Sequence, residues 1–153
     1  MAELNDIYST RLLDIAANMA RTKRLDDPDV TATAHSKLCG STITVDMTFE
    51  GDTIADYGQT VKACLLGQAS ASIVGREIVG VSIAEIQEIG RIMRAMLKEE
   101  GPPPEGRWAD LALLEPVRPY KSRHASTLLV FEAIDKAIAA HRARDEMGAA
   151  ANA

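Results

Sequence analysis

Apolar and polar residues alternate one by one between Ser41 and Phe49. The apolar positions of this run include Ile43, Val45 and Met47, and threonines or an aspartate stand between them. Successive side chains of a strand point to opposite faces of its sheet. The alternation therefore predicts a strand with one buried face and with its threonines in water.

Two further strands are predicted beside this one. Glu50-Gly51-Asp52 has the composition of a hairpin turn, after which Thr53 to Val61 returns as a second strand. Ala32 to Leu38 is a weaker candidate for a strand that precedes both. Strands joined by such short connections pair in antiparallel order, so the three together form a meander.

The spacing of apolar residues changes to steps of three and four elsewhere in the chain, which is the period of a helix. Tyr8, Leu12, Ile15 and Met19 follow this period and predict a first helix, which we expect to end at Asp26-Asp27-Pro28.

Two more helices are expected in the middle of the chain. One follows Cys64, and its small residues at 69–72 allow it to lie close against a neighbouring element. The other begins at Ser82, where Glu85 three residues later completes a capping box, and it stops at Gly101 and the prolines that follow.

The C-terminal part of the chain predicts a short helix over Trp108 to Leu114 and a long one that starts between Ser122 and Ala125. We expect a single domain over residues 1–144 and a flexible Ala-rich tail over 145–153. The order of elements predicts an α+β fold, a three-stranded antiparallel meander sheet packed on one face by helices.

Composition and charge narrow the classes of function. The 153 residues carry a formal net charge of −5, which argues against a general nucleic-acid-binding protein. No run of about 18 apolar residues predicts a membrane-spanning helix. Glu3, Asp6, Arg11 and Asp14 interrupt any signal-peptide core, so we expect a cytoplasmic protein whose thiols stay reduced.

The chain has two cysteines, and both fall at predicted strand ends. Cys39 precedes the alternating strand, and Cys64 lies where the returning strand meets a helix, whose N-terminus favours a thiolate. In a meander these two positions lie at the same edge of the sheet. The alternatives are a pair of metal ligands or two ordinary buried side chains, and two thiolates alone do not fill a tetrahedral metal site.

Three segments resemble, in order, the cysteine motifs of the U-type iron–sulfur cluster assembly scaffold family, which includes IscU, SufU and the N-terminal domain of NifU. They are Lys37-Leu38-Cys39-Gly40-Ser41, then Lys62-Ala63-Cys64 with the Ala-Ser-rich stretch behind it, and finally Arg123 to Leu129. The insertion from Gly101 to Arg123 is similar to the SufU branch. The resemblance covers about Leu4 to Ile138 and implies the fold of that family.

The chain departs from the family pattern at two positions. Ser41 stands where the family has an aspartate. Aligned on the last helix, the third cysteine position falls on Ser126, and a local shift would place it on Ala125 with His124 as the histidine. In the family that third thiol accepts sulfur from a pyridoxal-phosphate cysteine desulfurase, and neither serine nor alanine forms a persulfide.

The resemblance implies a scaffold or carrier, not an enzyme, that binds iron, a transient iron–sulfur cluster or Zn²⁺. We expect Cys39, Cys64 and His124 as ligands. Ser41, Ser126 and His35 are weaker candidates, and His35 is about 13 Å from Cys39 if the strand continues between them. Arg118, Lys121 and Arg123 are candidates for contacts with a partner.

The implied partners are a cysteine desulfurase and iron–sulfur acceptor proteins, with no nucleic acid and no membrane. A homodimer would bring four thiolates to one cluster. The alternative function is a zinc-binding sulfur-transfer partner or regulator of a cysteine desulfurase without a cluster of its own. A third reading keeps the architecture alone, as a binding module without a metal.

Overall fold

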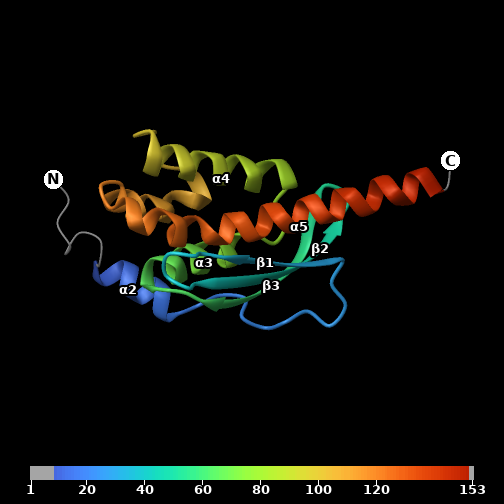
Figure 1. The fold of residues 1–153 in the computed structure, drawn as a ribbon, viewed down its shortest axis with the longest axis horizontal. Coiled ribbons are helices and arrows are strands. Elements are labelled where there is room, and N and C mark those ends of the chain that lie inside the picture. Colours follow the sequence, from blue (N-terminus) through green and yellow to red (C-terminus); the bar gives the residue numbers. More distant parts are fainter. Residues whose placement is uncertain (1–8, 152–153) are drawn as a thin grey trace.

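The computed structural model describes residues 9–151 and has the expected α+β fold. One antiparallel sheet has the strand order β1-β2-β3. Figure 1 shows α5 lying along this sheet, with α4 further out on the same side. The elements are α2 (Thr10–Ala17), β1 (Val30–His35), β2 (Thr42–Glu50), β3 (Thr53–Lys62), α3 (Leu65–Glu77), α4 (Ile83–Lys98), η1 (Gly106–Val117), η2 (Lys121–Arg123) and α5 (His124–Ala151).

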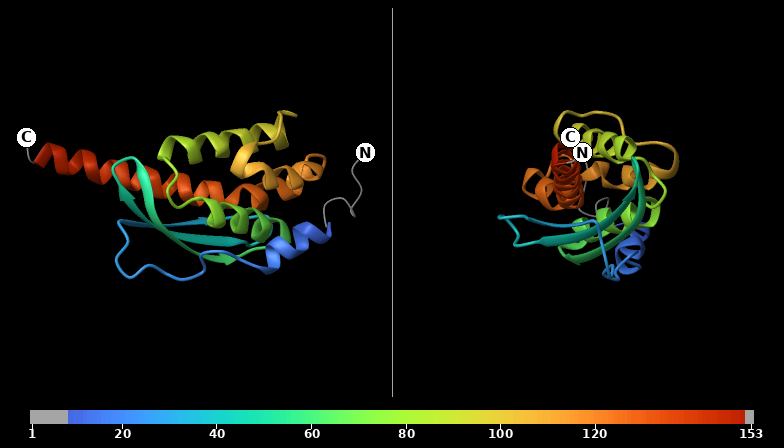
Figure 2. Two further views of the ribbon diagram at one scale, coloured as in Figure 1. Left: turned by 180° about the vertical axis from the view of Figure 1, so that it is seen from behind. Right: turned by 90° about the vertical axis from the view of Figure 1, so that its right-hand side faces the viewer.

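The sheet buries the side chains that the alternating pattern predicted. Ile43, Val45 and Met47 of β2 are fully buried beneath α5, while α3 packs against β3. Thr42 is paired with His35 of β1 and with Lys62 of β3. The register therefore places the end of β1, the start of β2 and the end of β3 at one edge of the sheet (Figure 2).

The outer face of the sheet is covered in part by the segment that joins α2 to β1. Asp46 shares this face with the threonines of β2, yet it is 0% exposed. Its carboxylate accepts hydrogen bonds from the Arg24 guanidinium, the Leu25 amide and the Thr31 hydroxyl. Burial by itself would raise the pKa of Asp46, but these donors outweigh it and hold that pKa below its ordinary value.

The first helix is shorter than the sequence predicted. Ser9 caps α2 by accepting from the Leu12 amide, and the helix ends at Ala17, well before Asp26. Asn18 leaves the helical conformation while its side-chain amide bonds to the carbonyl of Asp14. Met19 consequently lies beyond the helix, and Tyr8, also assigned to it, falls outside the described residues.

Only half of the predicted capping box forms at α4. The Ser82 hydroxyl accepts from the Glu85 amide at 3.0 Å, whereas the Glu85 carboxylate accepts from Trp108 Nε1 at 2.8 Å. Trp108 thereby anchors η1 to the start of α4. The predicted short helix before Pro116 is a 3-10 helix that is longer than expected and includes Pro116.

The last helix begins where the sequence predicted, and it continues to Ala151. The segment expected to be a flexible tail thus supplies the final turns of α5 up to that residue, and its flexibility stays a prediction. Figure 1 shows this end of α5 extending past the sheet. Within residues 9–151, none of the helices has the length and apolar character needed to cross a membrane.

Candidate thiol site

The loop between β1 and β2 is a tight turn that carries Cys39 at its tip. The Ser36 amide donates to the Ser41 carbonyl and the Gly40 amide donates to the Ser36 carbonyl, both at 2.9 Å. Gly40 has a φ of 71°, a left-handed conformation that glycine adopts without strain. The chain therefore bends directly after His35, and the Cys39 residue is exposed.

Two serine hydroxyls flank the sulfur of Cys39. The Cys39 Sγ lies 2.8 Å from Ser41 Oγ and 3.4 Å from Ser36 Oγ. Both serines are almost completely buried, at 5% exposure for Ser36 and 4% for Ser41. These hydrogen bonds lower the pKa of the Cys39 thiol, because they stabilise the thiolate more than partial burial disfavours it.

From the sequence we expected the stabilised thiolate at Cys64, and Ser36 was not among the candidate residues. The available signal was the three-residue spacing from Ser36 to Cys39, which is typical of a turn in which a side chain bonds back to a neighbour.

Cys64 lies at the same edge of the sheet, just after the end of β3 and directly before α3. It is the N-cap residue of that helix and is partly buried. Its Sγ lies 3.3 Å from Ser126 Oγ of α5, and Ser126 is 3% exposed while Ala125 is exposed. This contact supports the alignment in which Ser126, not Ala125, occupies the third cysteine position.

The approach of α5 to α3 at this point depends on Gly67. A Cβ at Gly67 would lie 2.8 Å from Ala63 Cβ and 3.0 Å from the carbonyl oxygen of Ser126. Both distances are shorter than ordinary van der Waals contact, so the absence of a side chain lets the two helix starts meet beside Cys64.

The structure does not assemble the three expected ligands Cys39, Cys64 and His124 into one group. Residues two apart in a helix point to nearly opposite sides, and Ser126 faces Cys64. His124 instead directs Nε2 to the carbonyl oxygens of Arg118 and Val117, at 2.9 and 3.3 Å. Within residues 9–151, no three His, Cys, Asp or Glu side chains are arranged to hold a metal ion.

His35 is engaged with the sheet itself. Its Nδ1 lies 3.2 Å from the Thr42 hydroxyl on the paired strand. The turn at Ser36 bends the chain as the sequence argument required, yet the ring stays with its strand partner.

Of the three cations expected to contact a partner, Arg118 is held by hydrogen bonds within the fold, whereas Lys121 and Arg123 lie at the surface. Arg118 donates to the carbonyl oxygens of Met96 and Gly101, at 2.7 and 3.0 Å, and thus ties η1 to the C-terminus of α4. Lys121 is exposed and Arg123 is partly exposed, on the short η2 that leads into α5.

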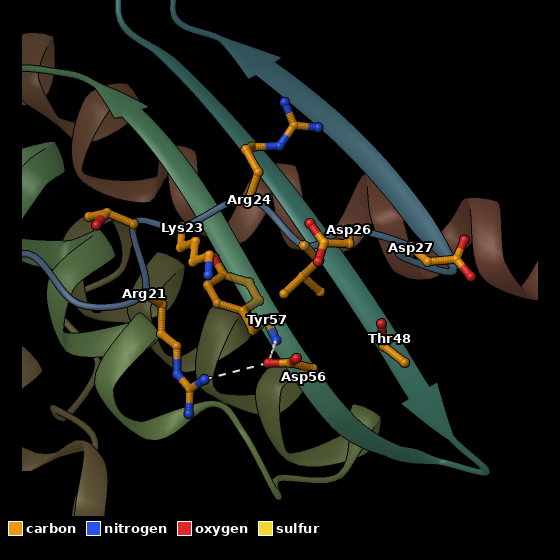
Figure 3. A pocket seen from close by; sticks show the side chains of 10 residues that line it. Arg21, Lys23, Arg24, Asp26, Asp27, Thr48, Asp56 and Tyr57 are labelled. Atoms are coloured by element: carbon orange, nitrogen blue, oxygen red, sulfur yellow. Dashed lines mark hydrogen bonds and ion pairs between the residues drawn. The ribbon is translucent and has the colours of Figure 1, made fainter.

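A pocket of about 510 Å³ lies on the outer face of the sheet, at the opposite end of β2 from the thiols (Figure 3). Its lining includes Lys23, Thr48 and Tyr57, and Figure 3 shows Arg21 directed at Asp56, which it meets at 3.4 Å. No cysteine or histidine is among the lining residues. This pocket therefore has no part in thiol chemistry.

Comparison with known proteins gives relatives over most of the chain. An iron–sulfur cluster assembly scaffold protein IscU from Thermotoga maritima is 26% identical over 132 residues, which is 86% of this chain and 92% of that protein. The IscU of Streptococcus pyogenes serotype M1 is 22% identical over 138 residues, 90% of this chain and 86% of its own length. No model of a protein family matches.

Solved structures agree with these relatives. The crystal structure of a nitrogen-fixing NifU-like protein (N-terminal) from Brucella abortus is 50% identical, with a TM-score of 0.86 over 88% of this chain and 94% of that one. A putative scaffold protein for the SUF system from Fervidobacterium islandicum shares the fold at 21% identity, with a TM-score of 0.80 over 88% of this chain and 98% of its own. An identity of 50% over nearly all of both chains indicates common descent as well as a common fold.

Proposed function

This chain belongs to the U-type iron–sulfur cluster assembly scaffold family, and on that premise we propose that it carries iron, an iron–sulfur cluster or zinc as cargo on the thiolates of Cys39 and Cys64. The observation that supports this site is the sheet register, which brings the residues flanking both cysteines to one edge. Cys39 is exposed there, so it is open to cargo and to partner proteins. The protein holds and transfers this cargo and catalyses no covalent reaction of its own.

The contact between Cys64 and Ser126 explains why one chain is short of ligands. A hydroxyl lies beside the Cys64 sulfur where the family has a thiol. An iron–sulfur cluster takes about four thiolate ligands, and one chain has only two cysteines. We propose that a second copy of the chain supplies the other two thiolates, so that the cluster bridges a homodimer.

Sulfur for the cluster would come from a cysteine desulfurase that carries a persulfide. The Cys39 thiolate attacks the outer sulfur of that persulfide, a new S–S bond forms, and the thiolate of the desulfurase cysteine leaves. Cys39 is favoured over Cys64 for this step because it is the exposed thiol of the pair. Once iron is bound and an external electron donor has reduced the persulfide sulfur to sulfide, which returns the Cys39 thiolate, acceptor proteins take the completed cluster.

The test is the content of iron, zinc and acid-labile sulfide in protein purified without oxygen. We expect Cys39→Ser and Cys64→Ser each to lose most of the metal while the circular dichroism spectrum stays native. Ser126→Cys should increase retention because it restores a third thiol beside Cys64, whereas the control Ala143→Cys, on the exposed far part of α5, should not. Unchanged metal in both single-cysteine variants would contradict the site.

Two further readouts refine the proposal. Cluster-loaded protein should elute as a dimer in size-exclusion chromatography. Metal retention by the Ser126→Cys variant should depend less on dimerisation. His124→Ala should keep the metal, because Nε2 is engaged with carbonyl groups of Arg118 and Val117. Zinc without sulfide, together with faster sulfur release by a desulfurase, would instead indicate the regulator of that enzyme.

A further inference from the structure

The three segments that converge on the thiol edge contain no acidic residue. These are residues 30–45, 57–76 and 116–131, in a chain that has 22 Asp and Glu in all. The sheet register joins the first two, and the hydrogen bond from Cys64 to Ser126 joins the third. The segments that hold Cys39 and Cys64 therefore carry no carboxylate of their own, and the carboxylates that share a pocket with Lys121 are Glu99 and Glu100, just after α4.

The same segments carry four cations that have no carboxylate partner. Lys37, Lys62 and Lys121 are exposed and Arg123 is partly exposed. Within residues 9–151, none of these four side chains takes part in an ion pair or a hydrogen bond. Elsewhere the arginines are regularly paired with carboxylates: Arg11 and Arg76 with Asp110, Arg21 with Asp56, Arg24 with Asp46, Arg91 with Glu88, Arg94 with Asp135, Arg107 with Glu85.

An exposed apolar side chain lies next to one of these cations, Lys37, in the turn that carries Cys39. Leu38, the neighbour of Cys39 in the turn, is 75% exposed. A large apolar side chain within a charged ring is typical of a protein–protein contact. Phosphate polyanions gain nothing from it, and the net charge of −5 opposes their approach to the rest of the molecule.

We propose that Lys37, Lys62, Lys121 and Arg123 form a basic rim that docks an acidic surface of a protein partner, whose reactive sulfur is thereby delivered to Cys39. The choice of Cys39 as the receiving thiol rests on the proposed function. The rim attracts acidic surfaces over a distance and orients them before contact, which raises the rate of encounter more than the final affinity.

A thiol–disulfide exchange reaction tests the rim without any metal. The background is Cys64→Ser, so that Cys39 is the only thiol. The probes are two ten-residue peptides with one central cysteine carried as a mixed disulfide with thionitrobenzoate, one rich in Glu and Asp and one with Gln and Asn instead. The Cys39 thiolate attacks the peptide sulfur, a new S–S bond forms and coloured thionitrobenzoate leaves.

The measured quantity is the ratio of the rate constants for the acidic and the neutral peptide, in which the intrinsic reactivity of Cys39 cancels. At low ionic strength we expect a ratio of about ten, falling toward one in about 1 M salt. Lys62→Gln with Arg123→Gln should lower the ratio to about three. The control pair Lys23→Gln with Arg142→Gln removes the same charge away from the thiols, Arg142 being about 27 Å along α5 from its start, and should leave the ratio unchanged.

Three results would overturn the proposal: a ratio near one at low salt, an equal loss in the control pair, or equal rim-dependent binding of a 20-nucleotide DNA or of phosphatidylglycerol vesicles. The last would assign the rim to phosphate groups. Because no metal is involved in this reaction, the two proposals can fail separately. A protein that shows the expected ratio but retains no metal would refute the cargo proposal alone. A protein that retains metal but shows a ratio near one would refute the rim alone.

Discussion

At the scale of single residues, the surroundings of Cys39 are set by two buried hydroxyls. Ser36 and Ser41 are held by the backbone hydrogen bonds of the turn, so their Oγ atoms stay beside the sulfur. Neutral donors of this kind stabilise a thiolate without adding a charge. In the proposed cargo site they would also weaken the hold of Cys39 on a metal, since hydrogen bonds to ligand sulfurs draw electron density from them. A labile ligand suits cargo that has to be passed on.

Removing either hydroxyl should make Cys39 harder to ionise. The hydrogen bonds lower the pKa of this thiol in the folded protein, so Ser36→Ala or Ser41→Ala should raise the pH midpoint of its alkylation by iodoacetamide, measured in the Cys64→Ser background. The rate at pH 7 should fall accordingly. Ser122→Ala, which removes an exposed hydroxyl from η2, is the control and should leave the midpoint in place. A midpoint that does not move in either test variant would show that the serines only shape the turn.

At the scale of elements, the site depends on how closely the starts of α3 and α5 approach each other. The small residues of α3 were expected to let it lie close to a neighbour, and Ala69 and Ala71 are indeed fully buried. Gly67 is a point of close approach, because a Cβ there would lie 3.0 Å from the carbonyl oxygen of Ser126. The contact between Cys64 and Ser126 is thus a consequence of helix packing.

Gly67→Ala should separate these helix starts. The added methyl would overlap Ala63 and the Ser126 carbonyl, and overpacking of this kind costs about 1–3 kcal/mol. We expect a lower urea midpoint together with reduced metal retention. Gly148→Ala is the matched control, because nothing lies within 4 Å of a Cβ there and alanine favours the helix. Equal stability of the two variants would contradict the tight contact at Gly67.

At the scale of the whole molecule, Asp46 joins parts of the chain that are distant in sequence. Its carboxylate binds Arg24 and Leu25 of the segment that crosses the sheet and Thr31 of β1. The ion pair with Arg24 by itself contributes little to the stability of the fold, since the Arg24 side chain is 58% exposed. The buried carboxylate matters more, because all of its donors would lose their acceptor with it.

Asp46→Asn should lower the free energy of unfolding at pH 7 by about 2 kcal/mol, since a charged acceptor with several donors is lost. The folded-state pKa of Asp46 lies below its unfolded value, so its stabilisation is complete above the unfolded pKa of about 3.9 and disappears as the pH falls through the folded one. Urea unfolding of both proteins between pH 2 and 7 measures this difference. The exposed Asp27→Asn should show none of it, and a difference independent of pH would refute the argument.

The basic rim and the bridged dimer are compatible at this scale. Two rims that face each other repel, so cluster-free copies should stay apart. A thiolate-ligated cluster is anionic and offsets that repulsion. The cargo and an acidic partner would therefore compete for the same cations, which gives the protein a physical reason to release one as it binds the other.

The elements and the edge that carries the cysteines followed from local pattern and short connections. Alternation identified β2, and the hairpin turn after it identified β3. Helical spacing identified α4 and α5, and the meander order placed Cys39 and Cys64 at one edge. Such features depend on neighbours in sequence, so they can be read without coordinates. The resemblance added the third motif and its missing thiol at Ser126.

Only the tertiary structure decided where individual polar side chains point. In the folded chain, His124 bonds to the carbonyl of Arg118 and Glu85 accepts a hydrogen bond from Trp108. Asp46 is buried on a face of the sheet that the sequence pattern predicted to be exposed to solvent. The physical reason is that such a direction depends on how one element is rotated and covered by others far along the chain. The sequence alone thus determined that the chain has two cysteines and at which edge of the sheet they lie. The packing of α3 against α5 determined what surrounds them.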